Sequence, residues 1–125
     1  MVKRIALIGS LGVQMLYWLS VVAVVVFSLV TVDVPVVVDD QDKYHHFIAY
    51  AGLAILGCLS YPARAYRAVQ FVMLVLLGVG LEWAQSKVPG RFTDFWDVVA
   101  NTCGVLSGTL IGSWVVAKCK NLIKI

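Results

Sequence analysis

EWAQSKVPGRFTDFWDVVANTCGVLSG, residues 82–108, joins two apolar segments through a Pro89-Gly90 turn. Polar and ionisable side chains are dense in this stretch, although they are sparse in the apolar segments on either side. Ionisable groups are costly at membrane depth, so such a group of side chains indicates a functional site. The polar residues of the stretch are Glu82, Gln85, Lys87, Arg91, Asp94, Asp97 and Asn101.

The composition of the whole chain is that of a membrane protein. Of its 125 residues, 61% are hydrophobic and 14% are charged, whereas soluble domains contain about 45–50% apolar and about 25% charged residues. The mean hydropathy is +0.89. We therefore expect a single all-α transmembrane domain, residues 1–125, in contact with the lipid bilayer.

Four apolar segments predict a bundle of four transmembrane helices. We place them at residues 5–30, 44–61, 68–86 and 95–117. The acidic, proline-containing segment 31–42 is expected to be a loop, and residues 63–67 a tight basic loop. Lysine and arginine residues collect before the first segment, between the second and third, and after the last. Because basic loops stay in the cytoplasm, both termini are predicted to be cytoplasmic.

Small residues recur every fourth position in the last segment, at Ala100, Gly104, Gly108 and Gly112. Small side chains on one helix face let two helices approach closely in lipid, so we interpret this stripe as a packing surface. The three cysteines lack the spacing of a metal site or a disulfide framework.

The predicted topology places polar residues from three segments near the outer membrane face. Asp97 and Asn101 are four positions apart and share one helix face, as do His46 and Tyr50. The full set of candidate site residues is Asp42, Lys43, His46, Tyr50, Glu82, Gln85, Arg91, Asp94, Asp97 and Asn101.

Two interpretations of these residues stay open. They form either a buried network that holds three helices together or a ligand site. Arg91 is either the counter-ion of Glu82 or Asp97, or the group that binds an anionic ligand. His46, Glu82, Asp94 and Asp97 could supply metal ligands, but compact ligand motifs such as H-E-x-x-H do not occur, so we expect no metal and no cofactor. No basic, aromatic-interleaved surface for nucleic acid is present.

Two blocks of residues resemble the VanZ-like family of small bacterial membrane proteins. The first block contains Asp42-Lys43, His46-Phe47 and Tyr50. The second contains, in order, Glu82, Gln85, Pro89-Gly90-Arg91, Asp94, Asp97, Asn101, Gly104 and Gly108. The resemblance implies a multi-pass protein of the bacterial plasma membrane. It also implies a link to glycopeptide antibiotics, because the namesake of the family is associated with teicoplanin resistance.

Three functions are compatible with these features. We favour a non-enzymatic envelope protein whose outward site binds a lipid headgroup, a cell-wall precursor or the glycopeptide itself, with Arg91 and Lys43 holding the anion. The second is a membrane-embedded enzyme that uses His46 or Glu82 as a general base on a lipid-linked substrate. The third is a structural or transport subunit of a larger complex.

Overall fold

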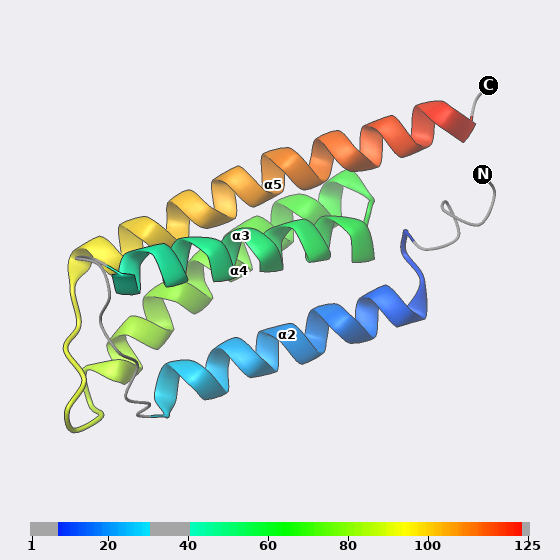
Figure 1. Ribbon diagram of the computed structural model, residues 1–125. Helices are drawn as coiled ribbons and strands as arrows, with labels where there is room; N and C mark the ends of the chain where they lie inside the picture. Colours follow the sequence, from blue (N-terminus) through cyan, green and yellow to red (C-terminus); the bar gives the residue numbers. More distant parts are fainter. Residues whose placement is uncertain (1–7, 31–40, 124–125) are drawn as a thin grey trace.

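A computed structural model describes residues 8–30 and 41–123 of the chain. This part of the chain is all-helical and contains no strand, which confirms the predicted all-α class. The helices, labelled as in Figure 1, are α2 (Leu11–Leu29), α3 (Gln41–Ser60), α4 (Arg64–Gln85) and α5 (Phe95–Ile123).

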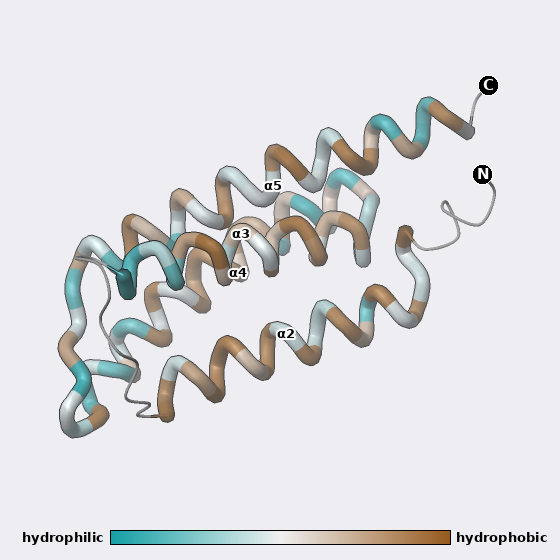
Figure 2. Tube along the Cα trace, viewed as in Figure 1, coloured by the Kyte–Doolittle hydropathy of each residue, from teal (hydrophilic) through white to brown (hydrophobic). Residues whose placement is uncertain are grey.

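Successive helices run in opposite directions along the bundle (Figure 1). Helices α2 and α4 therefore end where α3 and α5 begin, and we call this the site end. At the opposite end, α4 begins with Arg64 and Arg67, and α5 finishes with Lys118 and Lys120, so we call it the basic end. Hydrophilic residues gather toward both ends of the bundle, with apolar residues between them (Figure 2).

Three of the helices are long and apolar enough to cross a membrane: α2, α4 and α5 from Phe95 to Leu122. Most side chains of α2 and α4 are not covered by protein, which suits contact with lipid. Helix α3 is less apolar and is not among the three. It packs against each of the other helices, most extensively against α5.

The packed interior is centred on α3, which supplies Tyr50, Leu53 and Ala54 to a cluster completed by Leu74 of α4 and Val105 of α5. The cluster lies where α3, α4 and α5 meet. Helix α3 is thus the central element of the bundle, and the more apolar helices surround it.

The glycine stripe of α5 is the surface that packs against α3. A Cβ atom added at Gly108 would overlap the carbonyl oxygen of Ala51 and lie 2.8 Å from the Ala54 Cβ. One added at Gly112 would lie 2.7 Å from the Cβ of Cys58. Real Cβ contacts are not this short, so only glycine permits the observed approach of the two backbones. The packing interpretation of the stripe is confirmed.

Helix α2 is fastened to the end of α3 by polar contacts at the basic end. The Gly9 backbone N–H donates to the Leu59 carbonyl oxygen at 2.7 Å, and the Ser60 hydroxyl donates to the Val13 carbonyl oxygen at 3.1 Å. Gly9 has a φ of +74°, which a glycine adopts readily, and the helix begins two residues later.

Two predicted helix starts were wrong. The first helix begins at Leu11, because the Ser10 hydroxyl accepts the Val13 N–H and caps it. Of the residues assigned to the helix before it, 5–7 lie outside the described residues. The second helix begins at Gln41, so Asp42 is helical and not in the loop. An acidic side chain in the first turn suits the helix macrodipole. The remainder of the predicted loop, 31–40, is outside the described residues.

The other two helices are longer than predicted. Helix α4 begins at Arg64, so the expected basic loop 63–67 is mostly its first turn. No proline or glycine interrupts the chain between Ala63 and Gln70. Helix α5 continues to Ile123 instead of ending at Ala117. Lys120 in its last turn favours this extension, because cations stabilise helix C-termini.

A tight turn at Pro89-Gly90 leads from α4 toward α5. The Arg91 N–H donates to the Val88 carbonyl oxygen at 3.2 Å, and Gly90 has a φ of +80°. Proline followed by a glycine with positive φ is the sequence of a type II turn. The turn was predicted, and it directs Arg91 back toward the bundle.

Candidate functional site

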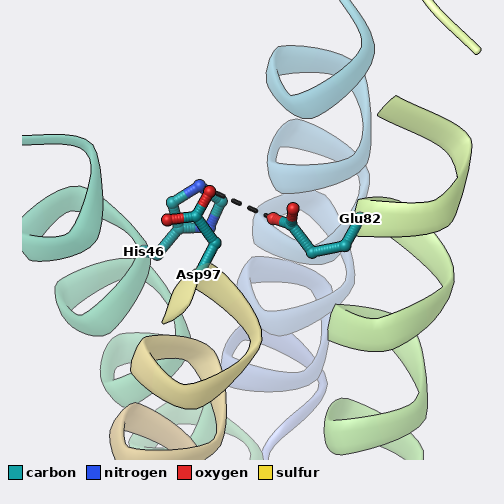
Figure 3. A group of neighbouring side chains, drawn as sticks. All are labelled: His46, Glu82 and Asp97. Carbon is teal, nitrogen blue, oxygen red and sulfur yellow. Dashed lines mark ion pairs between the residues drawn. The ribbon is translucent and has the colours of Figure 1, made fainter. Parts of the chain in front are cut away.

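Three ionisable side chains from three different helices converge at the site end. His46 of α3, Glu82 of α4 and Asp97 of α5 point toward one another (Figure 3). One ligand atom from each lies within 4.8 Å of the other two. The His46 Nε2 atom is 3.8 Å from Glu82 Oε1. We call these three residues the triad.

The orientation of the His46 ring is set by Asn101, one turn after Asp97 on α5. The His46 Nδ1 atom lies 2.9 Å from the Asn101 Oδ1 atom. A carboxamide oxygen only accepts hydrogen bonds, so Nδ1 carries the proton and donates. In a neutral ring the lone pair is then on Nε2, the nitrogen that faces Glu82.

The two carboxylates of the triad are buried and incompletely paired. Glu82 is 6% exposed and Asp97 is 4% exposed. Neither oxygen of Glu82 has a hydrogen-bond partner, and Asp97 Oδ1 also lacks one. Buried polar atoms are normally hydrogen-bonded, and each exception requires an explanation.

Lys43 supplies positive charge beside the triad. Its Nζ atom lies 3.6 Å from Asp97 Oδ1, 3.3 Å from Asp94 Oδ2 and 3.6 Å from Asp42 Oδ2. Only Asp97 of these partners is buried. Lys43 therefore links the buried triad to the exposed carboxylates at the rim of the site end.

Asp94 caps the beginning of α5. Its Oδ1 atom accepts the Trp96 N–H at 3.1 Å. This backbone hydrogen bond, with a further one from Lys43, lowers the pKa of the Asp94 carboxyl. The pKa of Asp94 is therefore lower in the folded than in the unfolded protein. The contribution of this cap to stability is fully present above the pKa of the unfolded state and is lost as the pH falls through the pKa of the folded state.

Tyr50 and Asn101 pack against Gly78 of α4. A Cβ atom added at Gly78 would lie 3.2 Å from Asn101 Nδ2 and 3.4 Å from the Tyr50 ring. The Tyr50 hydroxyl is buried without a hydrogen-bond partner. Gly78 thus provides the space in which two of the predicted site residues pack below the triad.

Gln85 and Arg91 have a different role from the triad, because both bind the C-terminal end of α2. Gln85 Nε2 donates to the Ser28 carbonyl oxygen at 2.8 Å. Arg91 Nη2 donates to the Phe27 carbonyl oxygen at 3.1 Å and also to that of Val30. The last carbonyl oxygens of a helix lack intrahelical hydrogen-bond donors, so these two side chains cap the C-terminal end of α2.

Among the described residues, Arg91 makes no ion pair with a carboxylate. Glu82 lies beside His46, which forms an ion pair with it only when the ring is protonated, and Asp97 pairs with Lys43. Arg91 therefore contacts no buried carboxylate directly, although its positive charge acts on Glu82 at longer range, so the two roles expected from the sequence both stay open. Its guanidinium borders a cavity between α2 and α3.

This cavity has a volume of about 660 Å³ and is open to the outside. Ala23, Val24 and Phe27 of α2 form an apolar wall. The rest of the lining is largely polar and comes from α3, Ser28, Gln85 and Arg91. His46 and Tyr50 belong to that lining, so the cavity reaches the triad. The residues along it are Ala23, Val24, Phe27, Ser28, Gln41, Asp42, His45, His46, Ala49, Tyr50, Gln85 and Arg91.

Several residues of this region were not predicted from the sequence. The apolar wall of α2 looks like an ordinary membrane segment, and His45, which also lines the cavity, was not among the candidate site residues. In the half of α4 nearer the basic end, the side chain of Gln70 is buried, and its Nε2 donates to the Ala54 carbonyl oxygen at 3.1 Å. A lone glutamine within an apolar segment was the available signal for that contact.

Comparison of the chain with protein-family models, curated proteins and solved structures finds no match.

Proposed function

We propose that the chain is a multi-pass protein of the bacterial plasma membrane that binds the polar headgroup of a lipid or of a lipid-linked cell-wall precursor. It crosses the membrane four times, with both termini in the cytoplasm and the site end facing outward. The resemblance to the VanZ-like family supports this assignment, and so does the gathering of basic residues at the opposite end.

The cavity between α2 and α3 is the observation that carries the proposal. One wall is apolar and is formed by a helix suited to lipid, whereas the other wall contains hydrogen-bonding groups and Arg91. An amphiphilic molecule matches this division, because its chain would lie against α2 while its headgroup reaches Arg91. Ligand pockets combine apolar surface with a few placed polar groups in this way.

Arg91 is the group best placed to meet a phosphate. It makes no ion pair with a described carboxylate, and its Nε atom is buried without a partner. An arginine can fork onto a phosphate while keeping a backbone contact through its remaining N–H groups. Lys43, by contrast, already contacts three carboxylates.

A bulky side chain in the cavity tests the proposal without changing a charge. Ala23→Phe should block the cavity, whereas Val22→Phe adds the same ring at the neighbouring exposed position. Native mass spectrometry on protein from vesicles doped with a polyprenyl-pyrophosphate lipid should detect a protein–lipid complex for the wild type and Val22→Phe. Ala23→Phe should lose at least about tenfold in occupancy, equivalent to about 1.4 kcal/mol. Equal occupancy in all three would refute headgroup binding in this cavity.

The same variants examine the connection to glycopeptides that the family resemblance suggests. Teicoplanin tolerance would be measured in a host expressing each protein at a matched membrane level. We expect increased tolerance with the wild type and Val22→Phe, and no increase with Ala23→Phe. A wild type that leaves tolerance unchanged would separate this chain from glycopeptide resistance and leave the lipid result to stand alone.

An enzymatic role is the second candidate, because His46 and Glu82 are adjacent and His46 borders the cavity. An imidazole whose Nδ1 is held by Asn101 has the arrangement of a general base. The test is turnover of the bound lipid by wild type and Glu82→Gln. Intact lipid after prolonged incubation with the wild type would count against catalysis.

A further inference from the structure

We propose that the triad of His46, Glu82 and Asp97 is a binding site for a divalent transition-metal ion, with Zn²⁺ as the best match. No metal was expected from the sequence, because compact ligand motifs do not occur in it. These ligands come from three helices and are separated by 36 and 15 positions along the chain, so no local motif could reveal them.

The donor set fits zinc. Zinc binds imidazole nitrogen and carboxylate oxygen, and functional zinc sites often use three protein ligands with one position left for water or substrate. Calcium and magnesium prefer more ligands, all of them oxygen, so an imidazole with two carboxylates favours a first-row transition metal. The ligand atoms, now within 4.8 Å of one another, must move slightly closer around an ion.

The unpartnered atoms of Glu82 provide an independent indication of a ligand. This side chain is more than nine-tenths buried, points into the triad and has no hydrogen bond to either oxygen (Figure 3). A nearby oxygen of Asp97 is also unpartnered. A buried carboxylate without hydrogen bonds is expensive unless a cation compensates it, and buried charges in proteins are paired or bind metals.

The hydrogen bond on the far side of the His46 ring is also that of a metal site. Metal-binding histidines nearly always donate the hydrogen of the other ring nitrogen to an oxygen acceptor, which fixes the tautomer. Here Asn101 accepts from Nδ1 and leaves Nε2 directed at Glu82. Asn101 is thus a positioning residue for the metal ligand His46.

Lys43 is a competing cation, because its ammonium lies 3.6 Å from Asp97 Oδ1. It also reaches Asp94 and Asp42, so it can stay at the rim when an ion occupies the triad. Removal of this positive charge by Lys43→Gln should therefore strengthen Zn²⁺ binding. A purely structural role of the Lys43 ion pairs predicts no such gain.

The proposal is tested with the full chain in detergent, stripped with a chelator and titrated with Zn²⁺ alone. Calorimetry and elemental analysis should find one ion per wild-type chain. Glu82→Gln and Asp97→Asn keep the side-chain shape and should weaken binding by more than about tenfold, and Asn101→Ala by about 10–100-fold. His45→Ala, at the neighbouring histidine, should bind as the wild type does.

Two further measurements distinguish zinc in the triad from zinc held by cysteines or bound loosely at the surface. Cysteines are alternative zinc ligands, and Cys58, Cys103 and Cys119 are free thiols. Co²⁺ should therefore give a spectrum without a thiolate charge-transfer band. Zn²⁺ should also raise the unfolding temperature of the wild type and leave that of Glu82→Gln unchanged. Absence of stoichiometric binding, a thiolate band, or equal binding by Glu82→Gln would overturn the proposal.

Discussion

At the residue scale, Asn101 connects the packing of the bundle with the chemistry of its site. It is 2% exposed, packs on Gly78 and holds the imidazole of His46. Polar groups that are buried in this way stabilise a structure only while their partners remain. Asn101 is thus both a contact between helices and the acceptor that sets the tautomer of His46.

Replacement of Asn101 by leucine should destabilise the protein. Asn101→Leu keeps a similar volume but leaves the His46 N–H without its acceptor, which costs about 1–3 kcal/mol. Thermal unfolding in detergent measures the loss. Thr102→Val is the control, because the Thr102 hydroxyl donates only to the Val98 carbonyl oxygen within the same helix. A variant of Asn101 as stable as that control would show that the hydrogen bond to His46 is dispensable.

The amino-acid types at the site allowed its residues to be predicted from the sequence, but the contact partners of these residues could not be predicted. Glu82, Asp97 and His46 attract attention because ionisable residues are unusual in apolar segments. Their meeting depends on how each helix is rotated, which helical spacing alone does not define. Arg91 binds backbone carbonyls of α2, and backbone groups carry no signature in a sequence. Its pairing with a helix 61–64 positions earlier therefore could not be predicted.

At the scale of elements, the contact between α3 and α5 depends on the absence of side-chain atoms. Gly104, Gly108 and Gly112 each lie against α3, whereas a Cβ atom added at Gly80 of α4 meets nothing within 4 Å. Gly108 and Gly80 can therefore be compared directly, because one packs closely against another helix and the other does not. The glycine stripe of α5 could be predicted from the sequence, because small residues at four-residue spacing indicate one packing face.

Gly108→Ala and Gly80→Ala should therefore have opposite effects on stability. At Gly108 the added methyl overlaps the α3 backbone, and overpacking of this kind costs about 1–3 kcal/mol. At Gly80 the methyl has space, and alanine should stabilise by about 0.4–1 kcal/mol because it restricts the unfolded chain. Unfolding temperatures in one detergent compare the two. Similar shifts for both variants would contradict the close approach of α3 and α5.

Helix ends were the least predictable elements. Arg64 and Arg67 suggest a loop because cations are unfavourable in a first helical turn. The absence of a breaker between Ala63 and Gln70 nevertheless lets the helix begin at Arg64. Charge therefore predicts a membrane side for this segment, but it does not define the backbone conformation.

At the scale of the whole molecule, charge is divided between the two ends of the bundle. All carboxylates in the described residues are at the site end, namely Asp42, Glu82, Asp94 and Asp97. The basic end contains arginines and lysines without acidic neighbours in the same residues. The physical basis for the proposed orientation is the larger number of basic residues at the basic end, because cytoplasmic segments retain basic residues. In the described residues four lie there, and three, Lys43, Lys87 and Arg91, lie at the site end.

Labelling of introduced cysteines tests that orientation. In a Cys103→Ser, Cys119→Ser background, Thr93→Cys at the site end should react with a membrane-impermeant thiol reagent in intact cells. Ala63→Cys at the basic end should react only after permeabilisation, because it would face the cytoplasm. Both positions are exposed on the protein, so protein burial does not limit the reaction. Labelling of Ala63→Cys in intact cells would reverse the proposed topology.

The central position of α3 has a consequence for how the chain is made. This helix carries Asp42, Lys43 and two histidines at its start and is not apolar enough to be counted among the candidate spans. Each such residue opposes entry of an isolated segment into lipid. Its glycine-lined partner, α5, emerges from the ribosome only after α4. In the proposed four-span topology, α3 is therefore expected to integrate fully only after α5 has emerged, and mutations in the α5 glycines should delay its integration.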